Sequence, residues 1–192
     1  MALVRRRRGG IVVSVDHDEL AMLTQVVGEI RELLAGDDEP TERTGDDAFQ
    51  ELVAGIGGQD APVEAPADPA LARLFPDAYR DDPEAAAEWR RLTESGLRTQ
   101  KRANADRMLA DLGGDLRTGP HGGKLTIDDD TAEAWLAALN DVRLVLGVRL
   151  DVTEDGDPFG GYDRHDPRAH PFLIYHWLTA VQDGLVRAVS GD

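Results

Sequence analysis

The spacing of apolar residues constrains the fold of this chain more than any other feature. In residues 130–150, apolar side chains recur every three or four positions, as Trp135, Leu136, Leu139, Val142, Leu146 and Leu150. Such spacing places side chains on one face of an α-helix. The same pattern occurs in residues 20–34 and 171–189. The sequence therefore predicts long amphipathic helices that pack against one another.

Acidic residues ahead of these stretches predict where two helices begin. Either Asp16 or Asp18 can cap the first helix, because a carboxylate accepts hydrogen bonds from the free N–H groups of a first turn. Asp82 and Pro83 are typical of a helix cap followed by a first-turn proline. The pair predicts a long helix that ends at about Leu112.

Two further helix starts follow from similar patterns. Asp130 and Glu133, three residues apart, resemble a capping box with Asp in place of Ser or Thr. They predict the start of the helix that ends at about Leu150. The last helix begins either at Pro171 or at Asp166.

β-branched residues near the N-terminus predict a small β element. Two short strands are expected on either side of Gly9 and Gly10, because glycine readily adopts the positive φ of a tight hairpin turn. The second strand contains Ile11, Val12 and Val13. Residues 124–127 can form a third strand that joins the hairpin.

These patterns together predict a mainly α protein: a single-domain helical bundle over residues 1–192 with a small N-terminal β-hairpin. Aromatic residues form only 5% of the chain, which favours helices over a sandwich of strands. A chain of 192 residues can bury a core without a metal or a disulfide. Residues 36–69 are rich in Asp, Glu, Gly and Pro, so we expect a mobile acidic loop there.

The chain contains no cysteine. This excludes disulfide bonds, thiolate nucleophiles, cysteine-ligated metals and thiol redox switches. The net charge of −16 disfavours direct nucleic-acid binding, because phosphate affinity comes mainly from Lys and Arg. No stretch has the length of a membrane span or the pattern of a signal peptide, so we expect a cytoplasmic protein with no membrane partner.

Motifs of known catalytic sites are missing from the sequence. It has no G-x-S-x-G nucleophile elbow, and the glycine-rich stretch before Lys124 departs from the P-loop pattern. The densest group of potential metal ligands is His165, His170 and His176, but His170 and His176 are six residues apart and do not share a helix face. We therefore predict a protein that is not an enzyme and has no cofactor. A metal-dependent enzyme that uses this histidine-rich segment is the alternative.

The predicted long helix carries a stripe of arginines. Arg91, Arg98 and Arg102 are seven and four residues apart, which places them on a common face. Glu94 can pair with Arg98, but most of the stripe has no counter-charge nearby on the helix. The three arginines are therefore candidate partner-binding residues for an acidic protein partner. A solvated helix face, balanced by the acidic loop, is the alternative.

Two more arginines lie beside the apolar stripe of residues 130–150. Arg143 and Arg149 need carboxylate partners, because an unpaired buried charge is costly. We interpret them as structural ion-pair candidates. Asp157, Asp163 and Asp166, in the loop that follows, are the expected partners.

Several segments resemble an actinobacterial family catalogued as a domain of unknown function, which includes oxidative-stress regulators of the AosR type. The resemblance rests on LFPDAY at residues 74–79, EWRRLTE at 88–94, LRTQK at 97–101 and AWLAALNDVRLVLGVRL at 134–150. The last of these motifs is the most specific. The resemblance covers nearly the whole chain apart from the acidic loop.

The resemblance implies a cytoplasmic regulator that acts through protein–protein contacts, with a stress sigma factor among its partners, and that affects transcription. Members that sense oxidants through cysteines have a mechanism that this cysteine-free chain lacks. We therefore expect a non-enzymatic regulator that binds a protein partner. The alternatives are the metal-dependent enzyme described above and a direct DNA-binding protein.

Overall fold

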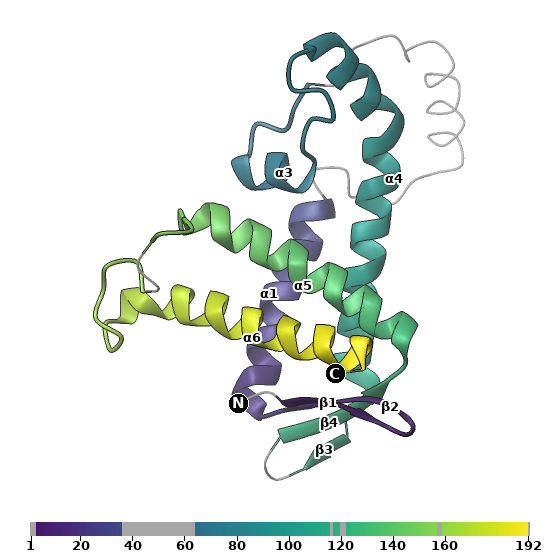
Figure 1. Cartoon of the computed structure of the whole chain (residues 1–192), viewed down its shortest axis with the longest axis vertical. Coiled ribbons are helices and arrows are strands. Elements are labelled where there is room, and N and C mark those ends of the chain that lie inside the picture. The colour runs from purple at the N-terminus through teal and green to yellow at the C-terminus, as the bar shows by residue number, and fades with distance from the viewer. Residues whose placement is uncertain (1–2, 36–63, 116, 120–121, 157–158, 192) are drawn as a thin grey trace, which may run out of the picture.

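The computed structural model describes residues 3–35, 64–115, 117–119, 122–156 and 159–191. Helices form most of this part of the chain, and a small antiparallel sheet lies at one end of them (Figure 1). Five α-helices and four strands are described. The predicted fold class, mainly α with an N-terminal hairpin and a joining strand, is confirmed.

The N-terminal hairpin consists of β1 (Leu3–Arg7) and β2 (Gly10–Val15). Residues alternate between buried and half-buried along β2, so Ile11, Val13 and Val15 face the core. Val4 pairs with Val13 and Arg6 with Ile11, which places Val4 and Arg6 on the same inner face. Arg5 and Arg7 therefore lie on the outer face of the sheet.

The third predicted strand is present, and a fourth strand pairs with it. β4 (Gly122–Ile127) pairs with β2, and the short β3 (Arg117–Gly119) pairs with β4, so the strand order is β1-β2-β4-β3. The strand at residues 117–119 was not predicted from the sequence. Its pairing with β4, through Gly119 and Gly122 among others, forms this part of the sheet.

Helix α1 (His17–Ala35) begins at a reciprocal cap, which settles the choice between Asp16 and Asp18. The Asp16 carboxylate accepts a hydrogen bond from the Glu19 N–H, and the Glu19 carboxylate accepts one from the Asp16 N–H, each at 2.9 Å. Glu19 is buried, and it also accepts a hydrogen bond from the Trp177 indole N–H at 2.9 Å. The start of α1 is thereby tied to the last helix.

Two helices with aspartate caps follow the undescribed segment. Helix α3 (Pro69–Leu74) is capped by Asp68 and helix α4 (Pro83–Ala110) by Asp82, each with proline in the first turn. The predicted start of the long helix is therefore confirmed. Beyond Ala110 the chain continues as a π-helical turn over Asp111–Asp115.

Helix α5 (Asp129–Arg149) lies at the centre and contacts α1, α3, α4 and α6 (Figure 1). Its Trp135 is fully buried and donates an indole hydrogen bond to Asp111 at 2.8 Å. The N-cap is Asp128, whose carboxylate accepts from the Thr131 N–H at 2.8 Å. The predicted capping box of Asp130 and Glu133 is wrong, because three consecutive aspartates can each serve as a cap and the strand β4 fixes which one does.

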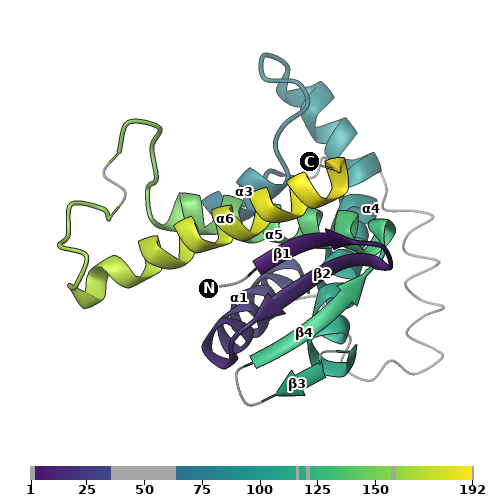
Figure 2. The ribbon, with the colours of Figure 1, turned by 60° about the horizontal axis from the view of Figure 1, so that its bottom comes forward.

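The last helix, α6 (His170–Ser190), follows a 3₁₀ turn at Pro167–Ala169. Asp166 caps this turn, so the chain becomes helical from Pro167 onward. Leu178, Val181 and Leu185 form the buried stripe. Figure 2 shows α6 running alongside β1.

Residues 36–63 of the predicted acidic loop lie outside the described residues. Residues 64–68 connect to α3 without regular secondary structure. In the part of the chain that is described, no helix combines the length and the apolar character needed to cross a membrane.

Candidate partner-binding surface

The first half of α4 exposes large apolar side chains. Trp89 is 47% exposed, Leu92 63% and Leu97 48%, and Tyr79, just before the helix, is 48% exposed. These four make up half of the large apolar side chains that are exposed in the described part of the chain. We call Tyr79, Trp89, Leu92 and Leu97 the α4 apolar surface. Several exposed apolar side chains gathered along one segment are typical of binding sites.

The position of α4 explains this exposure. Its second half packs against α1 and α5 through buried residues such as Ala105 and Met108. Its first half extends past α5, toward α3 and the segment that links α3 to α4 (Figure 1). Leu92 precedes Met108 by sixteen residues, which at about 100° per residue places it almost on the opposite side of the helix. Leu92 therefore cannot enter the core that Met108 fills.

A small groove of about 130 Å³ lies between α4 and the segment after α3. Its apolar lining includes Phe75, Pro76, Ala86, Trp89 and Leu97. A groove of this size and composition can accept a large apolar side chain from another molecule.

Two contacts hold the walls of the groove in place. The rings of Tyr79 and Trp89 meet edge to face, with centroids 6.4 Å apart. The buried Arg90 guanidinium forms an ion pair with Asp77, which fastens the segment after α3 to α4. Because Arg90 and Asp77 neutralise each other, the rim of the groove carries little net charge there.

The predicted arginine stripe lies on a different side of α4. Trp89 and Arg98 are nine residues apart, so at about 100° per residue they point in opposite directions. Arg91 forms an ion pair with Glu88 at 2.6 Å, and its hydrogen bond lowers the pKa of the Glu88 carboxyl. Arg102 is half-buried and has no ion pair with the described residues. The stripe thus carries more local counter-charge than the sequence suggested.

Arg98 is the most constrained of the three arginines. Its guanidinium forms an ion pair with Glu94 at 2.7 Å, donates to the Leu34 carbonyl at 3.2 Å and stacks over the Phe75 ring at 4.8 Å. These contacts join the end of α1, the end of α3 and the middle of α4. Arg98 therefore has a structural role, whatever partner its face binds.

Arg143 and Arg149 find partners other than the expected ones. Arg149 forms an ion pair with Asp68, the cap of α3, at 2.5 Å. Arg143 donates to the Gln182 amide at 2.5 Å and lies over the Tyr175 ring at 5.3 Å. α3 and α6 both contact α5 and supply these partners. Of the three expected carboxylates, Asp157 lies outside the described residues.

The histidines of the C-terminal segment do not converge. His165, His170 and His176 are all exposed, and no three His, Cys, Asp or Glu side chains among the described residues are placed to hold a metal ion. Nearby Asp166 is engaged by Arg168 at 2.7 Å, and this hydrogen bond lowers the pKa of its carboxyl to about 2.

The α4 apolar surface was not identified from the sequence. The sequence did contain evidence that an apolar side chain of this helix is exposed. Leu92 and Met108 cannot lie on one face of a straight helix, so one of them had to be exposed. Which half of the helix packs against the core could not be inferred from α4 alone.

Comparison with known proteins identifies relatives over nearly the whole chain. A family model described as "Domain of unknown function (DUF2017)" matches residues 1–189. Proteins of Mycobacterium bovis and Mycobacterium tuberculosis, each named oxidative stress regulator AosR, are 34% identical to this chain over 192 residues. The match covers 93% of this chain and 82% of each relative. No solved structure matches.

Proposed function

The chain belongs to the DUF2017 family, and on that premise we propose that it is a regulator that acts by binding a protein partner, not by catalysis. The names of its relatives support a role in the response to oxidative stress. The observation that carries the proposal is the α4 apolar surface. Exposed Trp and Tyr side chains beside an apolar groove are typical of the energetic centre of a protein interface.

The chemistry of this surface indicates the kind of partner. Trp89, Leu92 and Leu97 spread over slightly more than two turns of α4. A short helix of the partner can contact a stretch of this length. The groove beside them has room for one large apolar side chain. We therefore propose an amphipathic helix of the partner as the docked element, anchored by an apolar residue in the groove.

The resemblance described above suggests what this partner does. We propose that it belongs to the transcription machinery, with a stress sigma factor as the first candidate, and that binding takes place in the cytoplasm. Without cysteine, the chain cannot sense an oxidant through its own thiols. The oxidative signal would then reach it through the partner.

Affinity capture from the native cell tests the proposal. The tagged wild-type chain should capture a protein that an untagged control does not. Replacing Trp89 and Leu92 with alanine should abolish this capture, since both side chains are exposed and their loss leaves the core intact. Replacing Leu173 and Val152 with alanine is the matched control, because these apolar residues are also exposed but lie elsewhere.

A third variant separates the two faces of α4. Arg91→Glu with Arg102→Glu reverses the charge of the predicted arginine stripe while sparing Arg98. If only this variant loses the captured protein, the arginine face is the docking surface and the α4 apolar surface is not. If the wild-type chain captures nothing above the control, the regulator proposal itself fails.

A further inference from the structure

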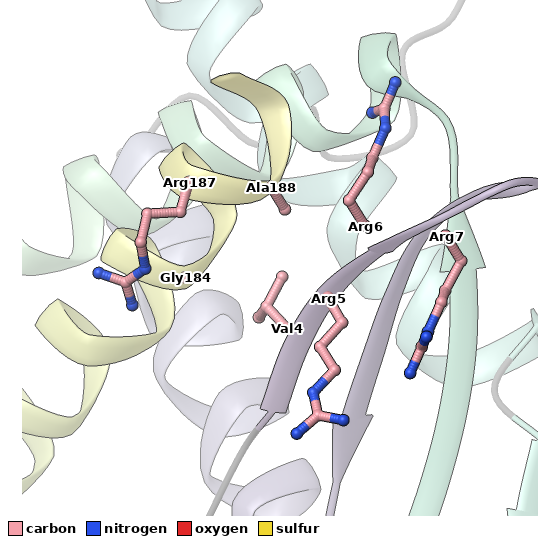
Figure 3. A pocket seen from close by; sticks show the side chains of 7 residues that line it. All are labelled: Val4, Arg5, Arg6, Arg7, Gly184, Arg187 and Ala188. Atoms are coloured by element: carbon pink, nitrogen blue, oxygen red, sulfur yellow. The ribbon is translucent and has the colours of Figure 1, made fainter. Parts of the chain in front are cut away.

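A second groove lies at the other end of the molecule, between β1 and α6 (Figure 3). It has a volume of about 330 Å³ and is lined by Val4, Arg5, Arg6, Arg7, Gly184, Arg187 and Ala188. Four of these seven residues are arginines, in a chain whose net charge is −16. The groove is therefore a concentrated patch of positive charge on an acidic protein.

One wall of the groove is the edge of a sheet. β1 pairs with β2 on one side, and no strand of the described residues pairs with its other side. Such an edge presents backbone N–H and C=O groups that can accept a further strand. Grooves between an edge strand and a helix are a known way to bind an extended peptide by strand addition.

The floor of the groove is apolar and narrow. Val4 points toward α6 in Figure 3, and a Cβ placed on Gly184 would lie 3.1 Å from the Val4 Cβ. Glycine at position 184 therefore lets the helix approach the strand closely. Ala188, one turn later, is buried. Val4, Gly184 and Ala188 give this side of the groove an apolar surface, which suits small apolar side chains of an added strand.

The four arginines differ in whether they already form an ion pair with a carboxylate. Arg6, on the inner face of β1, forms an ion pair with Asp129 at the start of α5. Arg5 and Arg7 are exposed on the opposite side of the strand, as Figure 3 shows, and neither they nor Arg187 have an ion pair with a described side chain. Three guanidinium groups around the groove can thus bind carboxylates from outside.

Because side chains alternate between the two faces of a β-strand, the groove should prefer a particular sequence in the strand that it binds. In a strand added beside β1, every second side chain would lie next to Arg5 and Arg7, and the others would face Val4 and the floor. Acidic residues suit the first set and small apolar residues suit the second. The arginines also repel a second copy of β1, so the edge discriminates against pairing with itself.

We propose that the groove between β1 and α6 binds an extended acidic protein segment, with alternating carboxylate and apolar side chains, as an additional strand of the sheet. This site is separate from the α4 apolar surface and does not depend on the function proposed for it. A nucleic acid fits less well, because the described residues that line the groove include no aromatic side chain for base stacking, and the whole chain is strongly acidic.

The direct test is fluorescence anisotropy with the full chain and a labelled peptide of alternating glutamate and valine. Arg5→Glu with Arg7→Glu should weaken binding by roughly tenfold or more. Arg73→Glu with Arg80→Glu is the matched control, because both arginines are exposed, lie outside the groove and give the same change in net charge. The control should bind as the wild type does.

A second measurement uses only the wild-type chain, so it does not depend on how the variants fold. Two versions of the peptide carry N-methyl groups on alternate residues, in the two possible phases. In an added strand, only every second backbone N–H group of the peptide donates to β1, and a methyl group on the nitrogen blocks this hydrogen bond. One version of the peptide should therefore lose binding, and the other should keep it. Equal binding of both versions, equal binding of a lysine–valine peptide, or displacement of the acidic peptide by a thymidine oligonucleotide would each overturn the proposal.

Discussion

The Lys101 ammonium lies 2.6 Å from the Asp141 carboxylate, in the contact between α4 and α5. The Asp141 side chain is 4% exposed, while Lys101 is 22% exposed. Burial raises the pKa of Asp141, and the hydrogen bond from Lys101 only partly offsets this effect. The pair thus holds a carboxylate in a place where its charge is poorly solvated.

This pair makes stability depend on pH in a defined direction. Because the pKa of Asp141 is higher in the folded chain than in the unfolded one, its ionisation opposes folding as pH rises through the folded pKa. Lys101→Met should remove this compensation and destabilise the chain by roughly 3 kcal/mol at pH 7. At pH 4 the loss should be smaller, since Asp141 can then remain protonated. Urea unfolding at both pH values measures the difference, and Lys124→Met, at an exposed site, is the control.

The turn of the first hairpin offers a test at two adjacent glycines. Gly10 has φ +133°, and a Cβ there would lie 2.5 Å from the Ile127 carbonyl oxygen, whereas a Cβ on Gly9 would meet nothing within 4 Å. Gly10→Ala should therefore cost roughly 3 kcal/mol in unfolding free energy, through backbone strain and the clash with β4. Gly9→Ala should change it by less than about 1 kcal/mol. Equal effects in thermal unfolding would contradict the register of β2 and β4.

Glu19 serves both the cap of α1 and the indole of Trp177. Glu19→Ala should destabilise the chain by about 2 to 3 kcal/mol, because it leaves the Asp16 and Trp177 N–H groups without this acceptor. Asp18→Ala, in the same first turn but exposed, should cost only about 0.5 kcal/mol. Chemical denaturation followed by tryptophan fluorescence distinguishes these outcomes.

The three arginines of the predicted stripe should not respond alike. Arg98→Ala removes contacts to Glu94, Leu34 and Phe75, so we expect a loss of about 2 kcal/mol in unfolding free energy. Arg102→Ala should change it by less than about 0.5 kcal/mol. If denaturation shows the two variants to be equally stable, the structural role assigned to Arg98 is wrong.

Local sequence signals predicted the parts of the fold that depend on neighbouring residues. The cap at Asp82, the hairpin at Gly9 and Gly10 and the helical stripe of α5 all act within a few positions of the chain, whereas the sequence left the cap of α1 open between Asp16 and Asp18. The run of three aspartates before α5 shows the limit of such signals. Each aspartate could cap the helix, and only the end of β4 selects Asp128.

Contacts between distant segments could not be predicted in this way. Arg149 pairs with Asp68 across a separation of 81 residues, and Arg98 reaches a carbonyl 64 residues away. The exposure of Trp89 and Leu97 depends on where α4 extends beyond the core, which is set by the packing of α1 and α5. The candidate surface therefore emerged only from the tertiary structure, although its residues lie within segments that carry the family resemblance.

Site-specific photo-crosslinking tests the central claim most directly. A photoreactive amino acid is placed at Leu92, in the α4 apolar surface, or at Leu173, another exposed apolar position, on α6. We predict that the Leu92 probe becomes covalently joined in cells to the protein that the wild-type chain captures, and that the Leu173 probe does not. Crosslinking from Leu173 with none from Leu92 would contradict the account.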